Sequence, residues 1–123
     1  MIDSSEAALA RRPERWQHSA GDSAVARLDI PADARRERSF EISFSMTVRA
    51  NDGAASPWHE LRVYADGQLQ WSRRIPTQQT AAFDGLEYRF RRRIEVGRAL
   101  RLHALVACAE GRRLNLEIEA DEA

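Results

Sequence analysis

Residues 86–120 decide the fold, and they read LEYRFRRRIEVGRALRLHALVACAEGRRLNLEIEA. Apolar residues stand at every second position over most of this stretch, with charged or polar residues between them. A side-chain period of two is typical of β-strands that bury one face. The stretch therefore predicts three consecutive antiparallel strands. Their inward residues are Leu86, Tyr88, Phe90, Ile94 and Val96, then Leu100, Leu102, Ala104, Val106 and Cys108, then Leu114, Leu116, Ile118 and Ala120.

Two glycine-containing turns predict how these three strands pair. Ala109-Glu110-Gly111 is typical of a three-residue loop with glycine in the left-handed position, and such a loop places Val106 opposite Leu114. Gly97-Arg98-Ala99 is interpreted in the same way, because a slip by one residue would exchange the two faces of the sheet. Arg92 interrupts the alternation by pointing inward. It predicts either a side chain that extends to the sheet margin or a β-bulge.

The preceding residues predict further strands. Ser23–Ile30 and Ser39–Arg49 alternate cleanly, and the second is expected at the centre of a sheet because its inward side chains are large throughout. His59–Ile75 predicts a hairpin that turns near Asp66-Gly67. A two-residue turn there mixes the two faces. We therefore predict a three-residue loop, Ala65-Asp66-Gly67, that pairs Val63 with Leu69 and Leu61 with Trp71.

This pattern predicts an all-β domain. Seven strands are expected, or eight if Trp16 anchors a short strand at Arg15–His18. A single sheet of that size would leave its apolar face in water, so we predict a two-sheet antiparallel β-sandwich with jelly-roll or Greek-key connectivity. An immunoglobulin-type disulfide is excluded, because Cys108 is the only cysteine. Residues 1–22 are expected to be a flexible segment and residues 23–123 a single domain.

Composition excludes several classes of function. The formal net charge is zero, and all 19 basic residues are arginine. Chemistry that depends on lysine, such as a Schiff base or a Walker-type phosphate loop, is therefore excluded. There is neither a secretory signal nor an apolar run long enough to span a membrane. With a single cysteine, these features predict a cytoplasmic protein, and the alternative is a secreted domain cut from a larger precursor.

The sequence predicts neither a catalytic centre nor a cofactor. His18, His59, His103 and Cys108 are widely separated and lack the paired spacing of metal ligands. No Gly-x-Ser-x-Gly motif is present. The chain is therefore expected not to be an enzyme. The enzyme alternative, a small catalyst with a cleft between the sheets, requires an enclosed polar pocket that contains His59 or His103.

One outer strand face predicts a weak anion patch of Arg89, Arg91 and Arg93. No aromatic residue lies between these arginines, as base stacking would require, so nucleic acid is not the expected partner. Their expected neighbours Glu87, Glu95 and Glu117 would neutralise the patch, which is typical of a solvated sheet face. This patch therefore supplies no function of its own.

A second outer face combines aromatic rings with polar groups, and it provides the candidate ligand-binding residues Trp58, Arg62, Tyr64, Gln68 and Gln70. Tryptophan, tyrosine and arginine are enriched at protein interfaces. The same mixture is found in sandwiches that bind sugars. The leading hypothesis is a non-catalytic binding or interaction module that takes a protein partner or a second copy of itself. The alternative is a carbohydrate-binding module that uses Trp58 and Tyr64.

Overall fold

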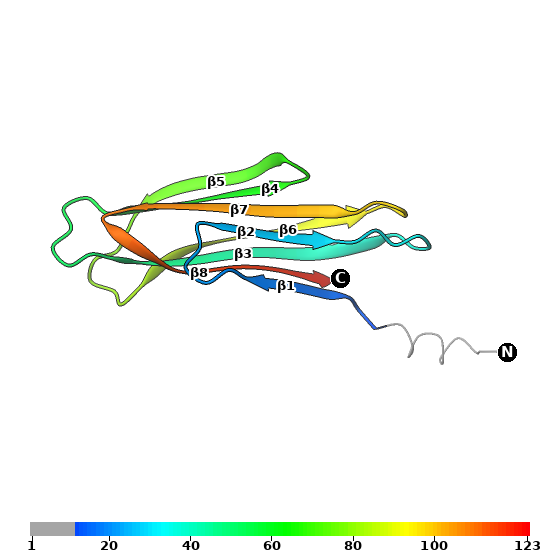
Figure 1. The fold of residues 1–123 in the computed structure, drawn as a ribbon, viewed down its shortest axis with the longest axis horizontal. Helices are drawn as coiled ribbons and strands as arrows, with labels where there is room; N and C mark the ends of the chain where they lie inside the picture. The colour runs from blue at the N-terminus through cyan, green and yellow to red at the C-terminus, as the bar shows by residue number, and fades with distance from the viewer. Residues whose placement is uncertain (1–11) are drawn as a thin grey trace.

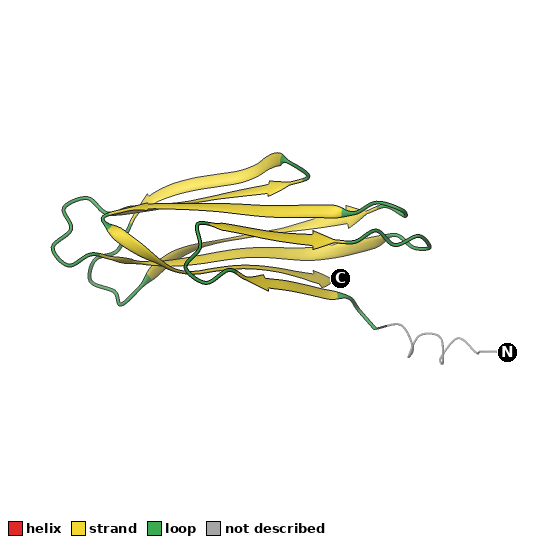
Figure 2. Ribbon diagram, in the orientation of Figure 1, coloured by secondary structure: helices red, strands yellow, loops and turns green. Residues whose placement is uncertain are grey.

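The structure is a computed structural model that describes residues 12–123. It contains strands and loops, and no described helix has the length and apolar character required to cross a membrane (Figure 2). The strands are β1 (Arg15–Ser19), β2 (Val25–Ile30), β3 (Arg38–Ala50), β4 (Trp58–Ala65), β5 (Gln68–Pro76), β6 (Asp84–Ile94), β7 (Leu100–Ala109) and β8 (Gly111–Glu122). They run roughly along the long axis of the molecule (Figure 1).

The strands form two antiparallel four-stranded sheets that stack face to face (Figure 1). One sheet, here called sheet A, has the order β1-β8-β3-β6, and sheet B has the order β2-β7-β4-β5. The pairs β1–β8, β2–β7, β3–β6 and β4–β5 are nested along the chain and alternate between the two sheets. This is the arrangement of a long hairpin rolled into two layers, which is a jelly roll. The predicted β-sandwich is confirmed.

The core lies between the sheets, and β3 supplies its largest side chains. Phe40, Ile42 and Phe44 have no exposed surface, and Met46 and Val48 are 1% exposed. Burial of a large apolar side chain contributes about 1.5–3 kcal/mol. The facing residues come from sheet B, chiefly Leu28, Ile30, Leu61, Val63, Leu102 and Ala104. The alternation seen in the sequence therefore identifies the inward faces correctly.

The predicted pairing of the last three strands is wrong. β6 and β8 belong to sheet A, whereas β7 belongs to sheet B, so the chain changes sheet at each turn. Val106 lies opposite Leu61, not Leu114. Both turns are tight bends, as predicted, and Gly97 has a positive φ angle of 75°. At the second bend the predicted left-handed glycine is wrong, because Glu110, with a φ angle of 55°, takes that conformation and Gly111 does not. A short bend serves equally for a hairpin and for a corner between sheets.

The predicted register of the middle hairpin is also wrong. The turn is the two-residue Asp66-Gly67, with φ angles of 50° and 79°, as expected for the turn that matches strand twist. Tyr64 lies opposite Leu69 and Val63 opposite Trp71, so Gln70 is an extra residue on β5. The bulge lies beyond the turn instead of within it. It restores the inward facing of Trp71, which a simple two-residue turn would have lost.

The structure places the strand around Trp16 in sheet A. Arg15–Ser19 pairs with β8 in a continuous register, so the ordered sheet begins before the predicted domain boundary at residue 22. Residues 1–11 of the predicted flexible segment lie outside the described residues.

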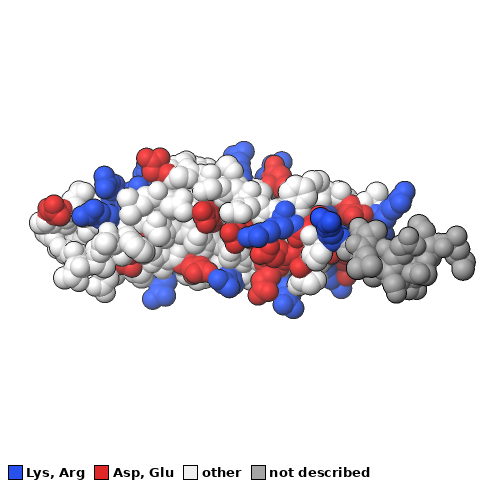
Figure 3. All heavy atoms as spheres, turned by 90° about the horizontal axis from the view of Figure 1, so that it is seen from below, with Lys and Arg blue, Asp and Glu red and all other residues white. Residues whose placement is uncertain are grey.

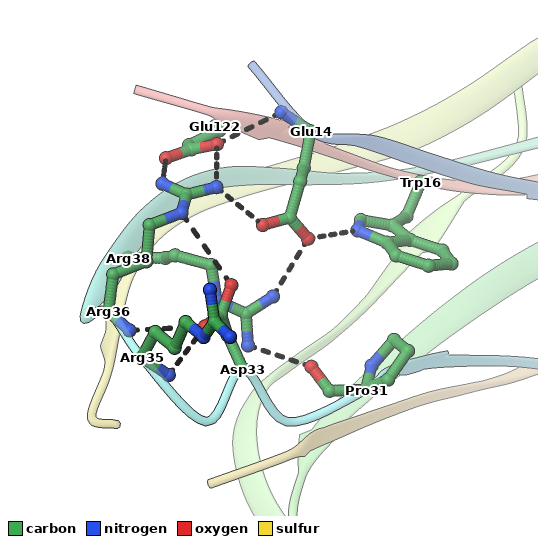
Figure 4. A network of polar contacts seen from close by, with 8 residues as sticks. All are labelled: Glu14, Trp16, Pro31, Asp33, Arg35, Arg36, Arg38 and Glu122. Carbon is green, nitrogen blue, oxygen red and sulfur yellow. Dashed lines mark hydrogen bonds and ion pairs between the residues drawn. The ribbon is translucent and has the colours of Figure 1, made fainter. Parts of the chain in front are cut away.

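A network of charged side chains ties β1 to the loop before β3 and to the end of β8 (Figure 4). Arg36 donates to both carboxylate oxygens of Glu122 and, at 2.8 Å, to Glu14. Arg38, whose side chain is only 2% exposed, donates to Glu14 and to the carbonyl of Pro31. Glu14 therefore supplies the counter-charge for a buried guanidinium, and it also accepts a hydrogen bond from the indole of Trp16.

Candidate functional site

Three of the five predicted ligand-binding residues share the outer face of β4. Trp58, Arg62 and Tyr64 all alternate with buried neighbours and point away from the core. Trp58 and Tyr64 are six residues apart, which is roughly 20 Å along a strand. Gln68 and Gln70 do not join them. Gln68 lies opposite the buried Ala65 at the hairpin end, and Gln70 is the bulge residue at the sheet margin.

The aromatic rings on this outer face are already in contact with protein groups. The guanidinium of Arg74 lies 3.7 Å from the centre of the Trp58 ring, and Glu60 holds it there at 3.1 Å. Glu60 also pairs with Arg62 at 3.0 Å. The ring of Tyr64 contacts the ring of His103, with 5.3 Å between their centres. A sugar would have to displace Arg74 before it could stack on that side of Trp58.

Two open depressions lie on the same outer face. One, of about 390 Å³, is lined by Val25, Leu105 and Ala107, with the charged Glu60, Arg62 and Arg74 beside them. The other, of about 660 Å³, is lined by Arg27, Asp29, Arg101 and His103 together with the Asp66-Gly67 turn. Arg101 pairs loosely with Asp29 at 3.5 Å. Both depressions are broad and shallow instead of enclosed.

The predicted anion patch lies on the outer face of the edge strand β6. Arg89 pairs with Glu87 at 2.7 Å, Arg91 with Glu41 at 3.7 Å and Arg93 with Glu37 at 3.5 Å. Of the predicted neutralising residues, only Glu87 pairs with these arginines. Glu117 lies on β8 opposite Ser45, and Glu95 follows the end of β6. The sequence could not place Glu37 and Glu41 because it did not give the order of strands. Figure 3, which views the molecule from below Figure 1, shows that basic and acidic residues are interspersed on that side of the molecule.

The edge strands β5 and β6 lie over one another and form what we call the open margin. Among the described residues, neither strand has a neighbour on its outer side. Trp71 of β5 stacks on Tyr88 of β6 across the two sheets, with ring centres 4.8 Å apart. Tyr88 in turn packs against Phe90 at 5.7 Å. These aromatic side chains are only half-buried, because no strand covers them on the outer side.

The two strands of the open margin are rich in arginine, although Glu60, Glu87, Glu41 and Glu37 pair with four of these side chains. β5 and β6 together carry six arginines against two acidic residues, in a chain whose net charge is zero. The acidic residues are Asp84 and Glu87, and the arginines are Arg73, Arg74, Arg89, Arg91, Arg92 and Arg93. Arg92 points inward from β6 and donates to the side-chain oxygen of Gln70 at 3.1 Å. β6 keeps a continuous register with β3, so Arg92 is a side chain that extends to the margin and not a bulge.

A depression lies at each end of β6. At its start, about 390 Å³ is bounded by Phe83, Leu86 and Glu87 and by the neighbouring part of β3. At its end, about 270 Å³ is bounded by Arg92, Ile94 and other residues near the turn to β7. Phe83 is 61% exposed, and Leu69 on β5 is 55% exposed. Sequence reasoning missed this surface for two reasons. The predicted pairing with Val63 would face Leu69 inward, but Leu69 lies opposite the outward Tyr64, and the alternating pattern does not show that β5 and β6 are edge strands.

The histidines and the cysteine occupy separate environments. His59 is completely buried, and its Nδ1 and Nε2 atoms lie 2.7 Å from the Thr77 hydroxyl and 3.2 Å from the Gly85 carbonyl. His103 is on the outer face of β7, and Cys108 is half-buried near the carbonyl of Gly111. Because it contacts Thr77 and Gly85, His59 connects β4, the end of β5 and β6 inside the core. Within residues 12–123, no three histidine, cysteine or acidic side chains are grouped to hold a metal ion.

Comparisons with known proteins bear on the fold alone. No protein-family model matches the chain, and no curated protein is similar to it in sequence. Dimeric latent PorU from Porphyromonas gingivalis is 15% identical with a TM-score of 0.57, over 87% of this chain and 10% of that one. The chain is thus similar in fold to a small part of PorU.

Two further structures superpose more loosely. A family 35 carbohydrate binding module from Clostridium thermocellum is 15% identical over 79% of this chain and 72% of that chain, with a TM-score of 0.38. A structure of infectious bursal disease virus, Gx strain, is 11% identical over 89% of this chain and 33% of that chain, with a TM-score of 0.45. These scores are too low to support a conclusion about function.

Proposed function

We propose that this chain is a non-catalytic protein-interaction module and that it binds a partner protein at the open margin. The observation that supports this proposal is the combination of two long edge strands, a half-covered aromatic row and an excess of arginine at one margin of the sandwich. Uncovered strand edges are templates for pairing with another chain, and proteins usually shorten or shield them. Aromatic residues and arginine are the side chains most enriched in the centres of protein interfaces.

The opposite margin lacks this combination. Its edge strands β1 and β2 have five and six residues, compared with nine and eleven in β5 and β6. The end of β1 is also covered by the network around Glu14, in which the charges neutralise one another. Short and charged edges are the usual protection against pairing. The open margin is therefore the better candidate for recognition.

Carbohydrate binding, the alternative function, is less well supported by the geometry. It would use the outer face of β4, where Trp58 and Tyr64 are too far apart to hold one sugar ring between them. Arg74 and His103 contact the two aromatic rings. Pairing of two copies through β6 is also disfavoured, because a twofold arrangement would bring the two arginine rows together.

We also propose a cytoplasmic location. Cys108 has no partner for an internal disulfide, which is usual in a reducing compartment.

The proposal is tested by comparing exposed apolar substitutions at the two margins. The double variant Leu69→Ser/Phe83→Ser removes apolar surface from the open margin, and Val25→Ser is the control at the opposite margin, where Val25 is 42% exposed. Each protein is immobilised and used to capture partners from a lysate, and the affinity of the captured protein is then measured in solution. We expect the wild type and Val25→Ser to bind equally, and the double variant to bind at least about tenfold more weakly. A captured partner that binds all three proteins equally would refute the proposal.

A further inference from the structure

Resting on the proposed function, we infer what occupies the open margin: an extended segment of the partner in which apolar and acidic residues alternate, added to sheet A as a fifth strand beside β6. Strand addition to a sheet edge is a general mode of peptide recognition, in which the backbone supplies affinity and alternate side chains supply specificity. Among residues 12–123, β6 offers both an unpaired backbone edge and alternating side chains for such recognition.

The backbone of β6 is suited to strand addition, whereas that of β5 is not. β6 pairs with β3 over eleven consecutive residues, from Asp84 to Ile94, without a register shift. β5 is interrupted by the bulge at Gln70 and ends at Pro76, which has no amide hydrogen. A bulge twists an edge away from a straight partner. The unpaired edge of β6 is therefore the longer and more regular template.

The inward side of β6 explains the apolar half of the alternation. Leu86, Tyr88 and Phe90 are partly buried and pack on the core, with Trp71 against the ring of Tyr88. An added strand places every second side chain beside this row. Apolar side chains there would cover the exposed parts of the rings and extend the core by one strand. Arg92, at the end of the row, favours a polar residue at the last inward position.

The outward side of β6 explains the acidic half. Arg89, Arg91 and Arg93 have side chains that are 65–69% exposed. The contacts of Arg91 and Arg93 with the carboxylates of Glu41 and Glu37 are long, at 3.7 and 3.5 Å. A guanidinium has five N–H donors, so each retains donors for a carboxylate on the added strand. Opposite charges on neighbouring strands favour pairing, and like charges oppose it.

The experiment uses ten-residue synthetic peptides with the full chain. The acidic probe alternates valine and glutamate. Its controls are a valine–lysine peptide and a valine–glutamate peptide of the same composition in scrambled order. Binding is followed by the fluorescence of the three tryptophans, of which Trp71 lies at the open margin. We expect the acidic alternating peptide to bind at least about tenfold more tightly than either control, and the preference to weaken with added salt.

Charge reversal locates the contact. In Arg89→Glu/Arg91→Glu the preference should invert toward the valine–lysine peptide, whereas Arg27→Glu, at the opposite margin, should leave it unchanged. Both substituted arginines of β6 are exposed, so urea unfolding should show that the double variant remains folded. Binding that does not distinguish the acidic from the basic peptide, or that ignores the reversal at Arg89 and Arg91, would overturn the inference.

Backbone methylation separates strand addition from side-chain contact alone. In an extended strand the amides of successive residues point to opposite edges. N-methylation of one alternate set of the acidic peptide should therefore abolish binding, and methylation of the other set should preserve it. Equal effects of the two sets would exclude pairing with β6. If the peptides fail while a captured partner still depends on Leu69 and Phe83, only this inference fails, and the proposed function stands.

Discussion

Removal of Glu14 should destabilise the sandwich strongly, because Glu14 is the counter-charge of the buried Arg38. The Glu14 carboxylate accepts hydrogen bonds at 2.8 Å from both Arg36 and Arg38 and at 3.1 Å from Trp16. Among residues 12–123, the guanidinium of Arg38, 2% exposed, keeps only the Pro31 carbonyl as a hydrogen-bond partner in Glu14→Ala. Its Nε atom is buried and makes no hydrogen bond within the same described range even in the wild type.

The expected magnitude follows from this burial. Breaking a buried ion pair by removing one partner costs about 3–5 kcal/mol. Glu14 itself is 22% exposed, so we expect the lower end, about 3 kcal/mol. A domain of this size has a free energy of unfolding of roughly 5–15 kcal/mol, so the loss is a large fraction of the total. The melting temperature should fall by roughly 10 °C.

The assay is urea unfolding followed by circular dichroism, with Glu37→Ala as the matched control. Glu37 pairs with Arg93 on the surface, where both side chains are more than half exposed, so its removal should change the free energy of unfolding little. The double variant Glu14→Ala/Arg38→Met removes the buried charge and should recover part of the loss. The reasoning is refuted if Glu14→Ala is as stable as Glu37→Ala, or if the double variant is no more stable than Glu14→Ala.

Two further predictions concern the polar groups that hold the strands together. The hydrogen bond from Arg36 keeps the pKa of Glu122 below its ordinary value of 4.5, so its contribution to stability is complete above about pH 4.5 and is lost as the pH falls through the lower pKa of the folded state. Urea midpoints of the wild type and Glu122→Gln should therefore differ at pH 7 and converge as the pH falls below the lowered pKa of Glu122, and a constant difference would contradict this. His59→Leu leaves Thr77 and the Gly85 carbonyl unpaired inside the core and should cost about 1–3 kcal/mol. His59→Leu/Thr77→Val should recover part of that loss, and no recovery would count against the hydrogen bond.

The inward faces could be predicted from sequence because they depend on local chemistry. Alternation in Phe40–Val48 and Leu100–Val106 reports which side chains avoid water, and that is the same whichever strands lie beside them. For this reason two stacked sheets were predictable although the pairing was not. The two-layer architecture requires only that every strand has one apolar face.

The pairing of strands could not be predicted because the turns do not specify it. The bend at Glu110-Gly111 is as short as a hairpin loop, yet it carries the chain from sheet B to sheet A. There, Gly111 approaches the Arg49 carbonyl so closely that a Cβ atom would lie 2.7 Å from it. That approach depends on a strand more than sixty residues earlier in the chain. Nested long-range pairing of this kind leaves no local signal in the sequence.

In the candidate site, too, the features set by local alternation could be predicted from sequence, and the features set by strand order could not. Outward residues of β4 were predictable from alternation, whereas the contact of Arg74 with Trp58 depends on the register of β5 across the bulge at Gln70. The open margin was not predictable, because Trp71, Tyr88 and Phe90 resemble core residues until the order of strands shows that β5 and β6 are edges.

Amide hydrogen exchange in β6, measured by NMR with and without the alternating valine–glutamate peptide, tests the central claim most directly. We predict that about every second amide of Leu86–Arg93 exchanges readily in the free protein and becomes protected when the peptide is added. The amides of β2, at the opposite margin, should not change. Amides of β6 that are all protected in the free protein, or peptide-dependent protection that appears in β2 instead, would contradict the account.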